Sequence, residues 1–152
     1  MDRFRRNLLG MLSMLILQFL LGMGVNLFVT LTRHHPGANP PEFFSGAARS
    51  VGWALTQGPL LLILHTVLGL LLFINSIVLL VAAFRLPSTA VRVLAGIGAL
   101  GIVAAGFNGA SFLSYNHDVN SYVMSVGFAL AAIVYTQLLY MLPASPPTSA
   151  QT

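Results

Sequence analysis

The chain has 152 residues, of which 57% are hydrophobic and 7% are charged, and its formal net charge is +4 at pH 7. Soluble domains contain about 25% charged residues, so this composition excludes an ordinary soluble domain and fits one compact membrane domain. The chain has no cysteine, which excludes disulfides, thiolate metal sites and cysteine nucleophiles. Its basic residues are scattered at the ends of apolar segments, which indicates membrane topology rather than binding to nucleic acid.

Four long apolar segments without Asp, Glu, Lys or Arg fill most of the sequence. They lie at residues 8–31, 60–84, 93–113 and 122–142. A helix needs roughly 20 mostly apolar residues to cross a bilayer, and backbone in lipid must satisfy its own hydrogen bonds. The sequence therefore predicts an all-α, polytopic membrane protein whose single domain, residues 1–142, is a four-transmembrane-helix bundle. The tail, residues 143–152, is rich in Pro, Ser and Thr and is predicted to be disordered.

The first apolar segment follows a basic N-terminus, as in a signal peptide, but it is too long and lacks an A-x-A cleavage pattern. We expect it to remain as the first span. Short basic segments stay on the cytoplasmic side, which predicts a multi-pass protein of the cytoplasmic membrane with both termini inside. These segments contain Arg3, Arg5, Arg6, Arg85 and Arg92, whereas the longer first loop contains Arg33 and Arg49.

The first loop, residues 32–59, changes character near its middle. Apolar residues recur at helical spacing after Glu42, and Pro41 suits a first helical position with Glu42 in the first turn. This pattern predicts a short helix in the outer membrane interface, anchored by Phe43, Phe44 and Trp53. The alternative is an exposed loop with scattered aromatic residues.

Small residues on the third span predict close helix contact. Gly101, Ala105 and Gly109 are spaced by four and therefore share one face. Spans associate in lipid through close backbone contact and interhelical hydrogen bonds, so we expect this helix to be central or tightly docked. The alternative is that the same face serves a homodimer or another membrane protein.

Polar residues fall into two layers when their depth is counted along each span. Near the outer surface, the residues predicted to form a ligand pocket are Asn26, His65, Asn108, Ser111, His117 and Asp118. A third loop, residues 114–121, is expected above them, with Asp118, Asn120 or Ser121 capping the last helix. A deeper layer of three amides, Gln18, Asn75 and Gln137, predicts interhelical hydrogen bonds.

His65 is the only Asp, Glu, Lys, Arg or His residue inside a span, and such residues are functional candidates. The segment from His65 to Leu72 reads HxxLGxLL and resembles the start of haem-bearing helices in haem A synthase-like and cytochrome b561-like proteins. The resemblance implies a b-type haem on His65, with Gly69 leaving room for the macrocycle. No second histidine lies inside a span, so a six-coordinate haem would need His117 or a histidine of the first loop. The alternative is that His65 has a structural role and is hydrogen-bonded to Asn26 or Asn108.

Other chemistry has little support in the sequence. A metal site built from His34, His35, His117 and Asp118 has suitable ligands, but the spacing matches no defined motif, and no metal site is predicted. No nucleophile elbow occurs, so we do not expect an enzyme. Intramembrane carboxylates and basic residues, which would mark an ion path, are missing from the four segments.

Three segments, Gln18–Val29, His35–Asn39 and Asn108–Leu113, resemble a group of small bacterial four-span membrane proteins without an assigned activity. The resemblance implies the same topology and a bacterial cytoplasmic membrane. We expect a non-enzymatic membrane protein: an accessory or scaffold subunit, or a small binding protein with a polar pocket near the outer surface. A homodimer or larger complex stays open. The alternatives are a haem- or quinone-linked electron-transfer protein using His65, and a small dimeric carrier of a neutral or lipophilic molecule.

Overall fold

A computed structural model describes residues 2–142, and this part of the chain is folded into five helices. They are α1 (Asp2–Phe28), α2 (Phe43–Thr56), α3 (Leu60–Phe84), α4 (Thr89–Tyr115) and α5 (Asp118–Met141). All but α2 are long and apolar enough to cross a membrane. The predicted all-α, four-span fold is therefore confirmed, while the tail predicted to be disordered lies outside the described residues.

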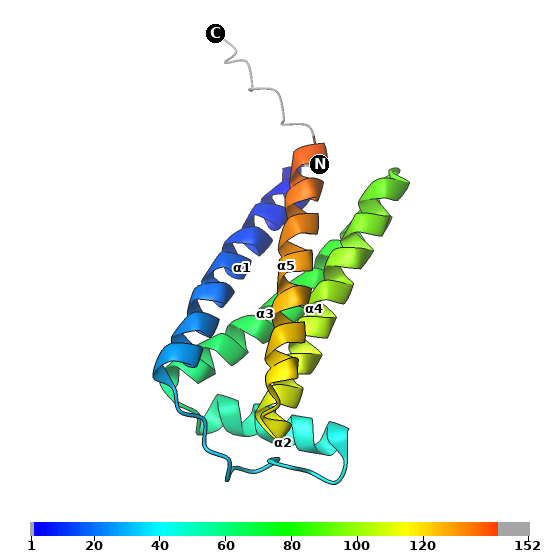
Figure 1. Cartoon of the computed structure of the whole chain (residues 1–152). Helices are drawn as coiled ribbons and strands as arrows, with labels where there is room; N and C mark the ends of the chain where they lie inside the picture. The colour runs from blue at the N-terminus through cyan, green and yellow to red at the C-terminus, as the bar shows by residue number, and fades with distance from the viewer. Residues whose placement is uncertain (1, 143–152) are drawn as a thin grey trace.

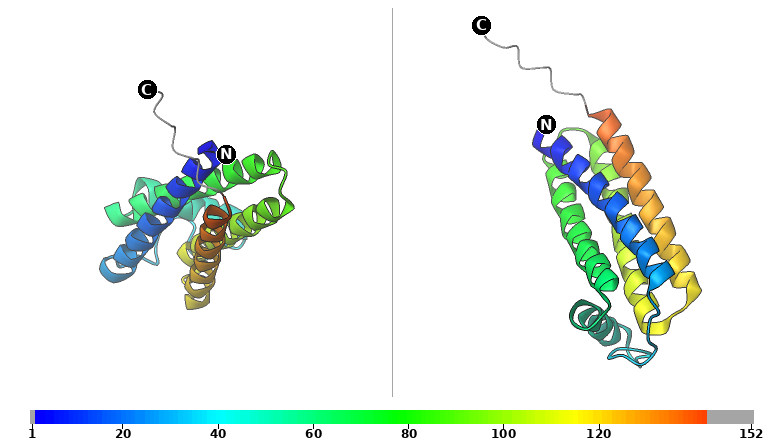
Figure 2. Two further views of the ribbon diagram at one scale, coloured as in Figure 1. Left: turned by 90° about the horizontal axis from the view of Figure 1, so that it is seen from above. Right: turned by 90° about the vertical axis from the view of Figure 1, so that its left-hand side faces the viewer.

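The four long helices form one bundle, and α2 lies across one end of it (Figures 1 and 2). The start of α1 and the end of α5 lie together at the opposite end. We call these the α2 end and the terminal end. The basic residues divide between them: Arg3, Arg5 and Arg6 on α1 and Arg85 and Arg92 around the α3–α4 connection lie at the terminal end, and Arg33 and Arg49 at the α2 end.

The closest helix pair is α4 and α5, where glycine backbones meet. A Cβ atom added to Gly101 would lie 2.7 Å from the carbonyl oxygen of Gly127, and one added to Gly127 would lie 2.7 Å from that of Gly101. The Cβ atom added to Gly127 would also lie 3.0 Å from the backbone nitrogen of Ala105. A Cβ atom on Gly109 would lie 3.3 Å from the Met124 sulfur. The face that contains Gly101, Ala105 and Gly109 thus packs on α5.

The apolar core lies mainly toward the terminal end. Side chains of α1, α3 and α5 are fully buried there, among them Leu8, Met11, Leu15, Leu79, Tyr135 and Leu138. Large apolar residues also cover the outside of the bundle, for example Ile16, Leu100 and Ile133, which are 65%, 67% and 58% exposed. An apolar exterior of this extent suits a helix bundle surrounded by lipid.

Among the four spans, only α3 begins and ends where the sequence predicts. The first span ends at Phe28 rather than Leu31, and the predicted third loop, residues 114–121, is reduced to Asn116 and His117. Asn116 takes the left-handed conformation (φ 53°) that closes α4. A helix can continue through polar residues after it has left the lipid. The end of an apolar run therefore does not mark the end of the helix. The predicted cap Asp118 is the first residue of α5, and the cap position belongs to His117.

Helix α2 begins two residues later than predicted, at Phe43 rather than Pro41, because Glu42 caps it instead of lying in its first turn. The Glu42 carboxylate accepts hydrogen bonds from the backbone N–H groups of Ser45 (2.6 Å) and Phe44 (2.7 Å). These bonds stabilise the charged carboxylate and lower the pKa of Glu42 below its ordinary value. The cap therefore works best above that lowered pKa and is lost as the pH falls through it.

Small residues form the buried face of α2, and two of its aromatic side chains add contacts to the rest of the protein. Its buried face consists of Gly46, Ser50 and Ala54, spaced by four. Of the three predicted membrane anchors, Phe43 packs on Phe107 of α4 at a centroid distance of 4.5 Å with the rings tilted by 30°, and Trp53 stacks on His35 at 4.3 Å. Only Phe44 points outward, 72% exposed. Two of the three aromatic side chains thus pack on the protein itself.

Candidate functional site

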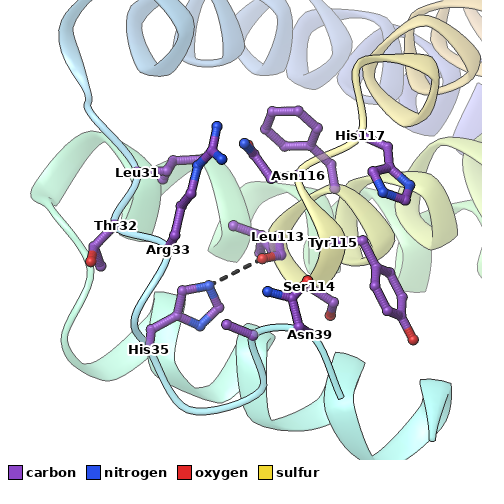
Figure 3. Close-up of a pocket in the computed structure, with 12 residues that line it drawn as sticks. Leu31, Thr32, Arg33, His35, Asn39, Leu113, Ser114, Tyr115, Asn116 and His117 are labelled. Carbon is purple, nitrogen blue, oxygen red and sulfur yellow. Dashed lines mark hydrogen bonds between the residues drawn. The ribbon is translucent and has the colours of Figure 1, made fainter. Parts of the chain in front are cut away.

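A cavity of about 260 Å³ opens at the α2 end, between the segment that follows α1 and the α4–α5 connection (Figure 3). The first segment contributes Leu31, Thr32, Arg33, His35, Ala38 and Asn39, and the second contributes Phe112, Leu113, Ser114, Tyr115, Asn116 and His117. The cavity is therefore built by two stretches of chain far apart in the sequence, at the level where α4 ends and α5 begins.

The segment after α1 is held in place by a glycine and by backbone hydrogen bonds. Gly37 has φ +94°, and a Cβ atom there would lie 2.5 Å from the carbonyl oxygen of Gly46 and 2.6 Å from the Ser50 nitrogen of α2. Only glycine fits this conformation and this space. The Asn39 N–H donates to the Ser114 carbonyl at 2.8 Å, and the hydroxyls of Ser50 and Ser114 lie 3.1 Å apart. The cavity wall is thereby fixed to both α2 and α4.

His35 makes three contacts at the cavity wall. Its Nε2 lies 3.1 Å from the Leu113 carbonyl oxygen, and its Nδ1 lies 3.1 Å from that of Pro36. The ring stacks on Trp53 with an interplanar angle of 15°. Leu113 belongs to the last turn of α4, where carbonyl groups have no partner within the helix. His35 therefore links the loop, α2 and the end of α4.

The side chains that line the cavity are basic or neutral. Arg33, His35 and His117 can carry positive charge, and no Asp or Glu is among the lining residues. Figure 3 shows the Arg33 and Asn116 side chains extending toward the same part of the cavity from opposite walls. Guanidinium and amide groups offer several N–H donors in fixed directions. This arrangement suits an anionic group with several acceptor oxygens.

Of the six residues predicted to form an outer pocket, only His117 lines this cavity. Asn26 is exposed on α1, and Asp118 is exposed at the start of α5. The Asn108 side chain donates to the Ala104 carbonyl of its own helix at 2.9 Å, and Ser111 is half-buried on α4. The structure does not bring the six together, because equal depth in the membrane does not give equal direction around a helix.

His65 pairs with Gln18 of α1 rather than with Asn26 or Asn108. The Gln18 amide nitrogen lies 3.2 Å from His65 Nε2. Glycines face both side chains: a Cβ on Gly22 would lie 3.0 Å from His65 Cε1, and a Cβ on Gly69 would lie 3.3 Å from the Gln18 amide nitrogen. Helix α1 thus fills the space beside the imidazole, and Gly69 accommodates Gln18 instead of a macrocycle. These residues do not fit a haem bound to His65.

Two of the three amides in the predicted deeper layer make interhelical hydrogen bonds, but they bond to other side chains and not to one another. Gln18 bonds to His65, the Asn75 amide donates to the Met11 sulfur at 3.4 Å, and Gln137 is exposed. Among residues 2–142, no three His, Asp or Glu side chains lie close enough to hold a metal ion. His34, His35, His117 and Asp118 accordingly do not form one site.

Three polar residues that line the cavity, Arg33, Asn39 and Asn116, were not among the predicted site residues, and His35 was considered only as a possible metal or haem ligand. The available signal was the Pro-Gly pair at Pro36 and Gly37, which marks a sharp turn able to fold the loop back. Comparison with family models, with curated proteins and with solved structures gives no match for this chain.

Proposed function

We propose that this chain is a non-enzymatic membrane protein that binds an oxyanion of the phosphate or sulfate type in the cavity at the α2 end. The observation that supports the proposal is the composition of the cavity wall, where Arg33, His35 and His117 occur without a single carboxylate. Arginine binds such anions through paired N–H groups in a planar fork. Two sources share this chemistry: the phosphodiester of a lipid headgroup, and a free anion in solution.

The orientation that we propose places the terminal end in the cytoplasm and the cavity on the outer side of a bacterial cytoplasmic membrane. It is supported by the five arginines at the terminal end, since basic residues are enriched in short cytoplasmic segments. The chain has no cysteine, so single cysteines can report each side. An impermeant maleimide should label Ala48→Cys on intact cells and should leave Ala90→Cys unlabelled until the cells are opened. The reverse pattern would contradict the orientation.

Calorimetry with sulfate tests the site itself. Protein purified in a neutral detergent should bind sulfate saturably, and Arg33→Gln should weaken binding on the order of tenfold or more, the effect of losing one charged hydrogen bond. Arg49→Gln is the matched control, because Arg49 is likewise an exposed arginine at the α2 end but does not line the cavity and donates to the Ser45 carbonyl. Equal loss in both variants, or loss in neither, would contradict a specific site at Arg33.

A lipid experiment separates the two sources of the anion. The protein is placed in nanodiscs of phosphatidylcholine alone or mixed with phosphatidylglycerol, and retained lipid is counted by native mass spectrometry. If the ligand is a headgroup, the wild type should retain phosphatidylglycerol, and Arg33→Gln should lose it. If the ligand is a free anion, the retained lipid should be the same in both proteins while sulfate binding still differs.

A further inference from the structure

His35 lies in the wall of the anion site proposed above, and its proposed role rests on that site. We propose that His35 takes up a proton when the cavity binds its anion, so that the cavity binds an anion and a proton together. His35 is then a positioning residue, because its ring nitrogens are engaged by backbone carbonyls and it acts on the anion through its charge and through the cavity wall.

His35 needs two N–H donors to satisfy the groups around its ring. Both ring nitrogens lie 3.1 Å from a carbonyl oxygen, Nε2 from that of Leu113 and Nδ1 from that of Pro36. Carbonyl oxygens only accept hydrogen bonds, and a neutral imidazole has one N–H where the protonated ring has two. Only the protonated ring can make both bonds. When the ring loses this proton, one of its nitrogens carries a lone pair that faces a carbonyl oxygen, and the two repel each other.

Two further contacts favour a charged ring. The imidazole stacks on the face of Trp53 at 4.3 Å, and an aromatic face attracts a cation. The Leu113 carbonyl lies in the last turn of α4, where the negative end of the helix dipole also favours positive charge. The hydrogen bonds, the stacked indole and the helix end are separate features, and all three favour the same protonation state.

The surrounding charges explain why a bound anion would couple to this proton. Arg33 and His117 line the same cavity, so they oppose a charge on His35 while no anion is present. An anion bound in the cavity would offset the repulsion that Arg33 and His117 exert on a charged His35. Glu42 does not supply a counter-charge, because its carboxylate caps α2. At the α2 end, the remaining titratable or charged groups on the elements packed around His35 are His34, Arg49, Tyr115, Asp118 and Tyr122. Linkage requires that each of the two ligands strengthen the binding of the other.

Trp53 offers a direct readout, because it is the only tryptophan in the chain. A protonated imidazole in contact with indole quenches its fluorescence. Titration between about pH 5 and 8, the range in which histidine titrates, should show emission falling as the pH falls. Sulfate keeps its charge over this range, and adding it should move the midpoint to higher pH. His35→Gln should remove the transition, whereas His34→Gln, which changes an exposed neighbour, should keep it.

Calorimetry with sulfate at the two ends of that pH range completes the test. The wild type should bind sulfate on the order of tenfold more weakly at the high pH, as expected for removing one nearby charge. His35→Gln should bind with the same affinity at both ends. Sulfate binding that does not depend on pH, or a pH dependence that persists in His35→Gln, would overturn the role of His35 and leave the anion site standing. Failure of the wild type to bind sulfate at either pH would overturn the anion site itself.

Discussion

The two helix pairs α4–α5 and α1–α3 both use glycine to bring helices together, but the glycines face different neighbours. Between α4 and α5, Gly101 and Gly127 each face the carbonyl oxygen of the other. Between α1 and α3, Gly22 faces the His65 ring and Gly69 faces the Gln18 amide. One interface is a contact of two backbones, and the other is a polar pair set into spaces that two glycines leave free.

This difference determines how each interface responds to change. A helix backbone cannot shift locally without moving the whole helix, whereas an imidazole or an amide can rotate by a few tenths of an ångström. Filling a glycine should therefore cost most in α4–α5 and least in α1–α3. In α1–α3 the sensitive property should be the pairing of polar atoms, since unpaired polar groups in lipid have no water to bond.

The largest effect is expected from Gly101→Leu. The new side chain would push α4 away from Gly127, and overpacking of this kind lowers the free energy of unfolding by about 3 kcal/mol. Gly106→Leu is the matched control on the same helix, because a Cβ atom there meets nothing within 4 Å. Thermal unfolding in detergent compares the two. Equal stability of the two variants would show that the face of α4 containing Gly101 is exposed to lipid and is not packed on α5.

An intermediate loss of stability is expected when the hydrogen bond between Gln18 and His65 is broken. His65→Leu leaves the Gln18 amide buried without its partner and should lower the free energy of unfolding by about 1–2 kcal/mol. The double variant Gln18→Leu/His65→Leu removes both polar groups and should recover most of that loss. A double-mutant cycle by reversible unfolding should give a coupling of about 0.6–1.7 kcal/mol, the range found between membrane helices. A coupling of zero would mean that the pair contributes nothing to the α1–α3 contact.

The smallest effect is expected from adding one methyl group on α1. Gly10→Ala should raise the free energy of unfolding by up to about 1 kcal/mol, because alanine favours helix and a Cβ there meets nothing within 4 Å. Gly22→Ala should change it by less, since its Cβ would lie 3.0 Å from His65 Cε1 and crowding offsets the gain. The same two substitutions in a His65→Ala background isolate the crowding. The difference between them should then vanish, and a difference that persists would place the crowding elsewhere.

The spans were predictable because exclusion of charge from lipid is a strong constraint that acts on every residue of a segment. Residues 60–84 match α3 at both ends. The errors lie where this constraint stops. Val29, Thr30 and Leu31 are apolar enough for a span but already form part of the loop, and Ser114 and Tyr115 continue α4 although they follow the apolar run. Outside lipid, local hydrogen bonds decide where a helix ends, and hydropathy does not report them.

The site was much less predictable. It depends on the direction in which each side chain leaves its helix and on how the loop folds back, and depth along a helix reports neither. Asn108 bonds to its own helix and Asn26 faces outward, so two residues chosen for depth have no part in a pocket. The cavity instead requires the loop to fold back at Gly37, and that turn depends on Gly46 and Ser50 of α2. Contacts between distant segments of this kind cannot be read from either segment alone.

The short connection between α4 and α5 has a consequence for how the protein is made. Only Asn116 and His117 join these helices, so they can enter the membrane as a hairpin and form their glycine contact as soon as α5 is synthesised. Helix α1 has no such neighbour: residues 29–59 are made before α3 begins. Gln18 therefore enters the bilayer before His65 does, and it has no partner within the chain until α3 is inserted. We expect this interval to be the stage of biogenesis at which the nascent protein depends most on other membrane components.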